Sequence, residues 1–243
     1  MLQNYKLFLS YDGTDYHGWQ RQPKKRTIQG TLENALEEIL RKKTSLIGAG
    51  RTDAGVHASG QVAHFKTKTS MKEDEIFRAL NSVLPRDIRV NYLSIAQADF
   101  HARKSAKSKI YQYRILNARD ASPFLIRYTL HWASPIDVES MKKAAPIFIR
   151  KHDFTPFSSN RLLHPVREIT LSEIRKKGKE IVYTVEANGF LRYMVRTIVG
   201  TLLEIGRGKI TPEEIDEIFK EGKRSQAGPT APARGLCLIK VNY

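Results

Sequence analysis

A glycine-rich polar run at residues 48–61 constrains this chain more than any other segment. It reads GAGRTDAGVHASGQ, with four glycines, an arginine and an aspartate two residues apart, and a histidine four residues after the aspartate. An apolar pair precedes the run, and an alternating strand-like segment follows it. Glycine is preferred where the backbone needs positive φ or another group must approach closely. The pattern predicts a polar loop between two buried strands that presents Arg51, Asp53 and His57.

The charge of the chain indicates what that loop faces. Lysine and arginine number 41 against 25 acidic residues in 243, giving a net charge of +16 and a pI near 9.9. Such a balance is typical of nucleic-acid binding. A solubility charge or an anionic membrane is the alternative, but no long basic amphipathic helix supports the membrane.

Cysteine usage and hydropathy narrow the class of protein further. Cys237 is the single cysteine, which excludes an intramolecular disulfide framework and any multi-cysteine zinc site. No apolar stretch approaches the roughly 18 residues of a membrane helix, and no apolar signal region follows Met1. We expect a cytoplasmic protein that does not bind membranes.

Familiar cofactor motifs do not fit the run. Gly48 and Gly50 match the start of a dinucleotide fingerprint, but Asp53 stands where the third glycine should be. A phosphate-binding loop ending in Gly-Lys-Ser/Thr is absent. The seven histidines form no metal-binding spacing. The sequence therefore predicts neither a cofactor nor a metal.

Periodicity predicts strands and helices in both halves of the chain. Strands are expected at residues 5–11, 45–49, 61–67, 88–95, 109–116, 166–174, 180–187 and 236–241, and helices at 28–43, 70–84, 138–149, 190–205 and from 211. We expect an α+β fold of two similar halves, 1–104 and 105–243. Each half would carry an antiparallel or mixed sheet flanked by helices, and the two would form a central basic cleft.

The residues alone leave the role of Asp53 open. A lone aspartate in a glycine-rich loop more often accepts hydrogen bonds from turn amides than takes part in catalysis. Arg51 strengthens the catalytic alternative, because residues two apart in an extended segment share a face and an arginine keeps a nearby carboxylate ionised. Arg51 could equally form a surface ion pair or contact a phosphate.

The run closely resembles the signature of the tRNA pseudouridine synthase A family, and so do other segments in the family's order. The first block is Tyr-Asp-Gly-Thr-Asp-Tyr-His-Gly-Trp-Gln at residues 11–20. The later blocks are residues 100–103, 111–113, 152–154, 194–196 and 231–236. One departure is Gln112, where arginine is common in the family. The resemblance covers nearly the whole chain.

The resemblance implies isomerisation of uridine to pseudouridine, in which the N1–C1′ bond breaks, the uracil turns, and C5 bonds to C1′. Because this isomerisation has no net gain or loss of atoms or electrons, the resemblance implies no cofactor or metal. The resemblance makes Asp53 the nucleophile. A carboxylate is ionised at neutral pH because its ordinary pKa is near 4.

The resemblance also assigns two further catalytic residues and two that handle the RNA. It implies that the ring of Tyr111 stacks on the target uracil and that Arg196 pairs with the catalytic aspartate. The structural alternative for Tyr111 is an aromatic residue of the core, and the one for Arg196 is a surface arginine beside the buried apolar stripe of a helix. A base inside a stem must be extruded before a carboxylate can reach it, and Arg51 and His57 are placed in the loop to assist this flipping.

Other basic and aromatic residues have two readings from sequence. Tyr16, Trp19 and Arg21 of the first block could contact RNA or pack locally. Four basic residues are expected to contact phosphates, with a solvated turn as the alternative: Arg103, Lys104, Lys107 and Lys109. We expect Tyr113 to be a core residue, and Asp12 and Asp15 to cap the first loop.

The implied substrate is tRNA, at positions 38 to 40 of the anticodon stem-loop, and the implied assembly is a homodimer. Two alternatives remain at this point. A non-catalytic RNA-binding or chaperone protein would share the charge and the aromatics but has no need of Asp53, Tyr111 and Arg196 together. A pseudouridine synthase with another RNA target would keep all three.

Overall fold

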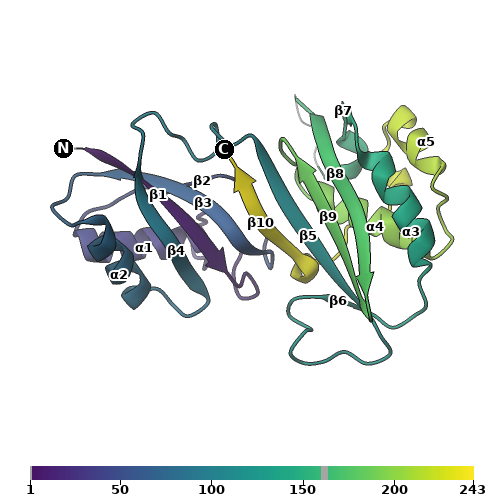
Figure 1. Ribbon diagram of the computed structural model, residues 1–243, viewed down its shortest axis with the longest axis horizontal. Coiled ribbons are helices and arrows are strands. Elements are labelled where there is room, and N and C mark those ends of the chain that lie inside the picture. The colour runs from purple at the N-terminus through teal and green to yellow at the C-terminus, as the bar shows by residue number, and fades with distance from the viewer. Residues whose placement is uncertain (1, 160–163) are drawn as a thin grey trace. The chain divides into compact units, whose positions relative to one another are not determined.

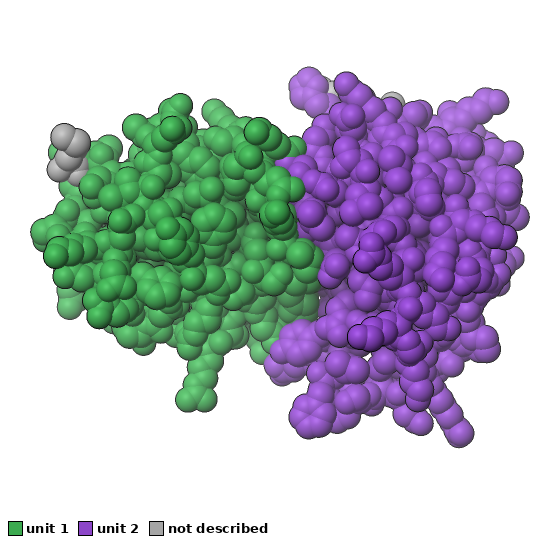
Figure 2. All heavy atoms as spheres, viewed as in Figure 1, with its two compact units in different colours: residues 1–107, 237–243 green, residues 108–236 purple. Residues whose placement is uncertain are grey.

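The computed structural model describes residues 2–159 and 164–243, which belong to two compact units. Unit 1 is built from residues 1–107 and 237–243, and unit 2 from residues 108–236 (Figure 2). The last strand thus returns to the unit that contains the N-terminus, whereas the sequence analysis grouped it with the second half. Nothing in the order of the elements indicates that return.

Unit 1 holds a mixed sheet with two helices. The strand order is β4, β1, β3, β10, and β2 pairs with β3. All neighbouring pairs are antiparallel except β3 and β10, which are parallel. Its elements are β1 (Gln3–Tyr11), α1 (Ile28–Leu40), β2 (Ile47–Gly48), β3 (His57–Thr67), α2 (Glu73–Val83), β4 (Ile88–Ala96) and β10 (Leu236–Asn242).

Side chains that alternate along the strands build the core of unit 1. Tyr5, Leu7 and Leu9 of β1 are buried, and the ring of Tyr5 stacks on that of Phe65 at 5.1 Å. Helices α1 and α2 bury an apolar stripe each and cover one face of this sheet (Figure 1). Helix α1 starts at its Thr27 cap, whose side chain accepts from the Gly30 amide.

Three element boundaries in unit 1 differ from the predicted ones. Helix α1 stops at Leu40 instead of continuing to residue 43, because Arg41 adopts a left-handed conformation with φ 52°. Helix α2 begins at Glu73 instead of residue 70, and the Lys72 amide before it donates to Glu75 at 2.8 Å. Strand β3 begins at His57, inside the run expected to be loop.

Unit 2 also combines strands with helices. The strand order is β5, β9, β8, β7, all antiparallel, and the short β6 pairs parallel with β5. Helices α3, α4 and α5 lie on one side of it (Figure 1). The elements are β5 (Ser108–Asn117), β6 (Leu130–Trp132), α3 (Val138–Ala144), β7 (Lys151–Asp153), β8 (Val166–Lys177), β9 (Glu180–Ala187), α4 (Met194–Gly206) and α5 (Glu214–Glu221).

Two helices of unit 2 are shorter than predicted. Helix α3 gives way to a 3-10 turn at Ala145, because Pro146 has no amide to continue the α-helical bonding. Helix α4 starts at Met194 and not at residue 190, because Tyr193 adopts a left-handed conformation with φ 63°. Arg192 therefore precedes the helix, and Arg196 lies in its first turn.

The predicted α+β class with mixed sheets and flanking helices is confirmed in both units. The core of unit 2 is formed by β5, β9 and the largely buried helix α4. In the described residues, no helix has both the length and the apolar character needed to span a membrane.

Candidate active site

The loop that carries Asp53 connects β2 to β3 and is held through its backbone. The Trp19 amide donates to the Thr52 carbonyl at 3.0 Å, and the Gly55 amide donates to the Tyr16 carbonyl at 3.3 Å. A turn closes the loop where the Val56 amide donates to the Asp53 carbonyl at 3.1 Å. The first motif block thus forms one side of the Asp53 loop.

Buried side chains also hold this loop in place. The Tyr11 hydroxyl lies 2.9 Å from Oγ1 of Thr52, and Gln61 donates to the Gly50 carbonyl at 3.0 Å. Burial raises the pKa of the Tyr11 hydroxyl above its ordinary value, so this group stays protonated at neutral pH. It can therefore act as a hydrogen-bond donor or acceptor, but not as an ion.

Gly18 marks the closest approach between the two segments. Its φ is +82°, and a Cβ built on it would lie 2.6 Å from the Thr52 carbonyl oxygen and 3.0 Å from the Asp53 carbonyl carbon. No side chain fits there without moving backbone, so the position requires glycine on both conformational and steric grounds.

The charged residues of the run differ in exposure. Thr52 is buried, Asp53 is partly exposed, and Arg51 is exposed. Within the described part of the chain, no ion pair of the Arg51 guanidinium is found. The hydrogen-bonded turn therefore carries a partly exposed Asp53 two residues from an exposed arginine.

His57 does not lie in the loop. It is the first residue of β3 and is 6% exposed. Its Nδ1 is 3.1 Å from both the Gly13 amide nitrogen and an Asp12 carboxylate oxygen. The Gly13 amide donates to Nδ1 in the first contact. The buried ring thus contacts the turn at the end of β1.

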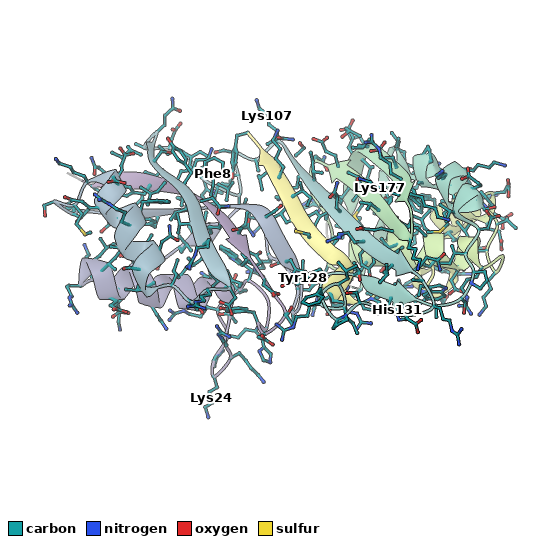
Figure 3. The ribbon with its side chains drawn as sticks, turned by 60° about the horizontal axis from the view of Figure 1, so that its bottom comes forward. Phe8, Lys24, Lys107, Tyr128, His131 and Lys177 are labelled. Carbon is teal, nitrogen blue, oxygen red and sulfur yellow. The ribbon has the colours of Figure 1, made fainter. Side chains whose placement is uncertain are left out.

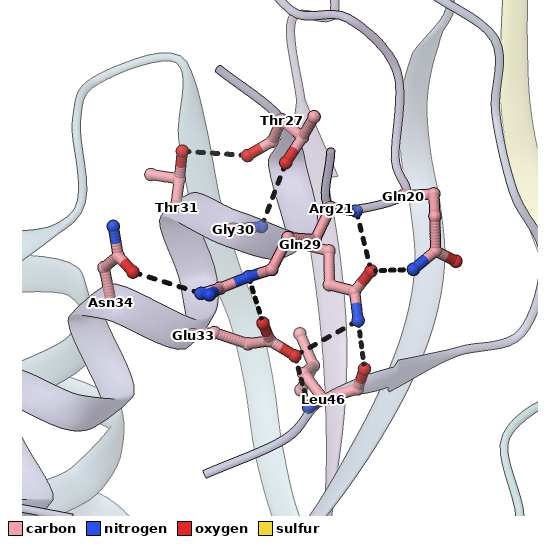
Figure 4. Close-up of polar contacts among 9 residues, drawn as sticks. All are labelled: Gln20, Arg21, Thr27, Gln29, Gly30, Thr31, Glu33, Asn34 and Leu46. Atoms are coloured by element: carbon pink, nitrogen blue, oxygen red, sulfur yellow. Dashed lines mark hydrogen bonds and ion pairs between the residues drawn. The ribbon is translucent and has the colours of Figure 1, made fainter. Parts of the chain in front are cut away.

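The aromatic residues of the first block and the neighbouring Arg21 pack against the protein itself, which was one of the two alternatives. Tyr16 and Trp19 are 3% and 2% exposed, so neither ring is available to stack on RNA. Asp12 accepts from the Thr14 amide at 2.9 Å and from its hydroxyl at 2.6 Å, as predicted for a loop cap. Arg21 pairs with Glu33 at 2.7 Å, in the network that fastens this loop to α1 and Leu46 (Figure 4).

Tyr111 lies in β5 of unit 2 with its ring held in place. It is 6% exposed and packs edge-on against the ring of Phe190, with centroids 5.2 Å apart and planes at 88°. Backbone pairing sets it opposite Val185 of β9. Phe190 carried no sequence signal, because it stands in an irregular segment after β9.

Arg196 is oriented by a carbonyl and by an aromatic ring. Its Nε donates to the Ala231 carbonyl at 2.7 Å, and the Ala231 amide donates back to the Arg196 carbonyl at 3.0 Å. The guanidinium carbon lies 4.8 Å from the Tyr193 ring centroid. Arg192 also reaches that ring, at 4.9 Å, but is exposed. The Tyr193 ring thus contacts two arginines: Arg196, which a hydrogen bond anchors, and Arg192, which is exposed.

Tyr113 joins the last block to the same region of unit 2. Its hydroxyl donates to the Pro232 carbonyl at 2.8 Å, and its side chain is fully buried, as predicted for a core residue. Burial raises its pKa, and the nearby charges of Arg196 and Arg234 oppose that shift. Three separate motif blocks therefore meet around Tyr113 and Arg196: residues 111–113, 194–196 and 231–236.

The remaining motif blocks, residues 100–103 and 152–154, make contacts within the protein. His64 accepts from the Ala102 amide at 3.1 Å, and Phe154 is buried among other phenylalanines. Arg103, Lys104 and Lys107 are exposed, as a phosphate-binding cluster requires, and Lys109 is partly exposed. A pocket of about 610 Å³ lies in unit 2 between Asp153 and Arg224, but neither Tyr111 nor Arg196 lines it.

The expected catalytic residues are thus divided between the units. Asp53 and Arg51 belong to unit 1, and Tyr111 and Arg196 belong to unit 2. Among the described residues, no group of three or more His, Cys, Asp or Glu side chains is placed to hold a metal. Unit 1 thus contributes a carboxylate and an arginine to the expected catalytic residues, and unit 2 contributes a tyrosine and an arginine.

Comparison with known proteins gives one family. The family model described as tRNA pseudouridine synthase matches residues 8–103 and 144–243. A tRNA pseudouridine synthase A from Acetivibrio thermocellus is 45% identical over 244 residues, covering 100% of both chains. One from Thermodesulfovibrio yellowstonii is 42% identical over 99% of each chain, and one from Halalkalibacterium halodurans is 46% identical over 97% of this chain and 91% of its own.

A solved structure titled as a Cbf5-Nop10-Gar1 complex aligns at 12% identity with a TM-score of 0.33, over 97% of this chain and 58% of that one. A score this low does not establish a shared arrangement. The sequence matches do establish the family: the chain belongs to the tRNA pseudouridine synthases. It is an enzyme of the isomerase class.

Proposed function

We propose that this enzyme converts uridine to pseudouridine in tRNA, at positions 38 to 40 of the anticodon stem-loop, with Asp53 as the nucleophile. The observation that carries the proposal is the similarity to tRNA pseudouridine synthases A along the whole chain, at 45% identity. The net charge of +16 supports a polyanionic substrate in a basic groove.

The environment of Asp53 supports its role as nucleophile. The turn around it is fixed by hydrogen bonds from Trp19 and Gly55 to neighbouring backbone, and the side chain is partly exposed. A carboxylate held on a rigid turn meets its target with little loss of entropy. In the reaction, the carboxylate assists cleavage of the N1–C1′ bond, the base turns, and C5 bonds to C1′. C5 then loses its proton to solvent or a nearby base, and N1 takes up one proton, so the product is an isomer of uridine.

Unit 2 supplies the two supporting residues in this proposal. Tyr111 is the residue that stacks on the uracil in this proposal, and its ring packs edge-on against Phe190. Arg196 pairs with the catalytic carboxylate in this proposal, and its hydrogen bond to the Ala231 carbonyl orients its guanidinium. Neither role requires a metal or a cofactor.

The exposed Arg51 is the better placed residue for base flipping. Its side chain stands at the surface of the Asp53 loop, where it can fill the space left by the extruded nucleotide. For His57 we propose a positioning role instead, since its buried ring contacts the turn at Asp12 and Gly13. We further propose that the enzyme works in the cytoplasm as a homodimer, which ultracentrifugation tests as a doubling of the 27.8 kDa chain mass.

The test is release of tritium from tRNA labelled at C5 of uridine. Wild type should release tritium without added metal, and replacing uridines 38 to 40 by cytidine should abolish the release. Asp53→Asn should lower the rate at least a thousandfold and leave tRNA binding within about twofold. Asp99→Asn, an exposed carboxylate of the same unit, is the matched control and should keep full activity.

Two results would contradict the proposal. Tight, salt-sensitive tRNA binding with no tritium release from wild type would favour a non-catalytic RNA-binding protein. Release that persists when uridines 38 to 40 are replaced would keep the enzyme class and move the target to another part of the RNA.

A further inference from the structure

The loop between β1 and α1 contains four basic residues near its tip, within residues 20–27. Arg21, Lys24, Lys25 and Arg26 are all exposed. No acidic residue occurs in the sequence between Asp15 and Glu33. By composition alone, the four cations are equivalent candidates for contacting a nucleic acid.

The two arginines fasten the loop to unit 1. Arg21 Nε pairs with Glu33 of α1 at 2.7 Å, and its terminal nitrogen donates to Asn34 at 3.2 Å (Figure 4). Arg26 pairs with Asp87 at 3.0 Å, just before β4. It also lies over the ring of Tyr16, 4.3 Å from the centroid. Their guanidinium groups are engaged by the protein itself.

The two lysines occupy the tip and take no part in this fastening. Lys24 has a left-handed backbone with φ 56°, which turns the chain, and the Lys25 amide donates to the Gln22 carbonyl across the turn. Lys24 points away from the rest of unit 1 (Figure 3). In the part of the chain that the structure describes, neither ammonium group forms an ion pair.

This tip is tied directly to the Asp53 loop. The Arg26 carbonyl accepts from the His17 amide at 2.9 Å, and the next residue, Gly18, packs against the backbone of Thr52 and Asp53. Chain steps of 3.8 Å through these links keep Lys25 within about 20 Å of Asp53. An RNA whose target base reaches Asp53 therefore brings neighbouring phosphates near the lysines.

We propose that Lys24 and Lys25 bind tRNA phosphates beside the target nucleotide, and that Arg21 and Arg26 hold the loop in the position to do so. The inference rests on the proposed function for its ligand. It divides the cations of one loop into RNA-binding and structural pairs, which the sequence does not do. Lysine suits the contact, since its ammonium is a flexible point charge that accepts any phosphate geometry.

The experiment compares three proteins by tRNA binding across a salt series from about 50 to 400 mM KCl. They are wild type, the Lys24→Gln/Lys25→Gln variant and the Lys42→Gln/Lys43→Gln variant. The second lysine pair is exposed, belongs to the same unit and stands at the opposite end of α1. Both variants change the net charge equally, so only position distinguishes them.

Each phosphate contact contributes about 0.7 to 0.9 to the slope of log K against log salt. The Lys24/Lys25 variant should therefore lose about 1.4 to 1.8 from the slope and bind roughly five- to eightfold more weakly per lysine near 0.1 M salt. Its KM for tRNA should rise while kcat at saturation stays within about twofold. The Lys42/Lys43 variant should keep the wild-type slope.

An unchanged slope for Lys24→Gln/Lys25→Gln would overturn the proposal, and so would an equal loss in both variants. The melting temperature is the control for correct folding. It should stay within about 1 °C of the wild-type value for both variants, because exposed substitutions change stability little. Binding is measured separately from turnover. Absence of tritium release from wild type would contradict the proposed function, whereas the slope alone decides the role of the lysines.

Discussion

The two units carry their parts of the candidate site in different ways. In unit 1, Asp53 stands on an irregular loop whose backbone is hydrogen-bonded to a second irregular loop, with Gly18 at the contact. In unit 2, Tyr111 stands on a strand and contacts the Phe190 ring, and Arg196 stands at the start of a helix and donates to the Ala231 carbonyl. Loop–loop contact permits a close approach but depends on backbone conformation, whereas regular elements depend on packing.

Because of this difference, we expect the two units to tolerate different kinds of substitution. A loop held by amides tolerates side-chain changes wherever the side chain points outward, and rejects any residue that moves its backbone. A strand or a helix tolerates substitutions that leave its backbone in place, but it does not tolerate the loss of a particular ring contact or hydrogen bond. Three substitutions test this comparison, in decreasing order of expected effect.

Gly18→Ala should have the largest effect after loss of Asp53 itself. The added Cβ would meet Thr52 and Asp53 backbone atoms at 2.6 to 3.0 Å in a residue with φ +82°. The loop must move, so we expect at least a hundredfold loss of kcat/KM and a destabilisation of about 2 to 4 kcal/mol. Tritium release and thermal unfolding measure the two losses.

Gly178→Ala is the matched control in unit 2. This glycine also has positive φ, +58°, but a Cβ built on it meets nothing within 4 Å. We expect a cost of about 1 kcal/mol, roughly 2 to 4 °C in melting temperature, with activity unchanged. Equal losses for the two glycines would show that conformation alone matters and that the close contact of the two loops does not.

Arg196→Lys should give the next largest effect and tests the unit 2 side. Lysine cannot both donate to the Ala231 carbonyl with a planar group and lie flat over Tyr193. We expect kcat/KM to fall about ten- to a hundredfold with a small change in melting temperature. Arg192→Lys, which changes the exposed arginine on the same ring, should stay within about twofold. Equal losses would remove the distinction between the anchored and the surface arginine.

The smallest effect is a pH dependence that belongs to unit 1. Burial lowers the pKa of His64 below its ordinary value, and the neighbouring charges of His101 and Lys66 lower it further, against a raising hydrogen bond to Ile47. Its Nδ1 accepts from the Ala102 amide, so the fold needs the neutral ring. Because the folded pKa lies below the unfolded one, stability is complete above about pH 6.5 and falls as pH drops toward the folded pKa.

Melting temperatures of wild type and His64→Asn between about pH 7.5 and 5.5 check this sign. Wild type should lose stability on acidification more steeply than the variant, although the variant starts lower because it loses ring packing. Parallel curves would assign the acid sensitivity to another group. Hydrogen exchange would then show whether the strands of unit 1 or those of unit 2 open first.

How far each part could be predicted follows from the kind of signal that it leaves in the sequence. The Asp53 loop was predictable because glycines and charged residues cluster where backbone must bend and side chains must face water. The α4 stripe was predictable from its apolar spacing, but its start was not, because a left-handed Tyr193 has no distinctive composition. The buried place of His57 escaped prediction, since a histidine in a glycine-rich run has the pattern of a loop residue.

The sequence by itself determined the α+β class, the positions of most strands and helices, the family and the residues to test, because periodicity, glycine placement and motif order are local properties. Only the tertiary structure decided that the last strand belongs with the first unit, that Tyr16 and Trp19 are buried, that Ala231 orients Arg196, and that two arginines of one basic loop are engaged while two lysines are not. These facts depend on which distant segments come into contact. The free energy that selects those contacts comes from burial and hydrogen bonding summed over the whole fold, which no short stretch of sequence contains.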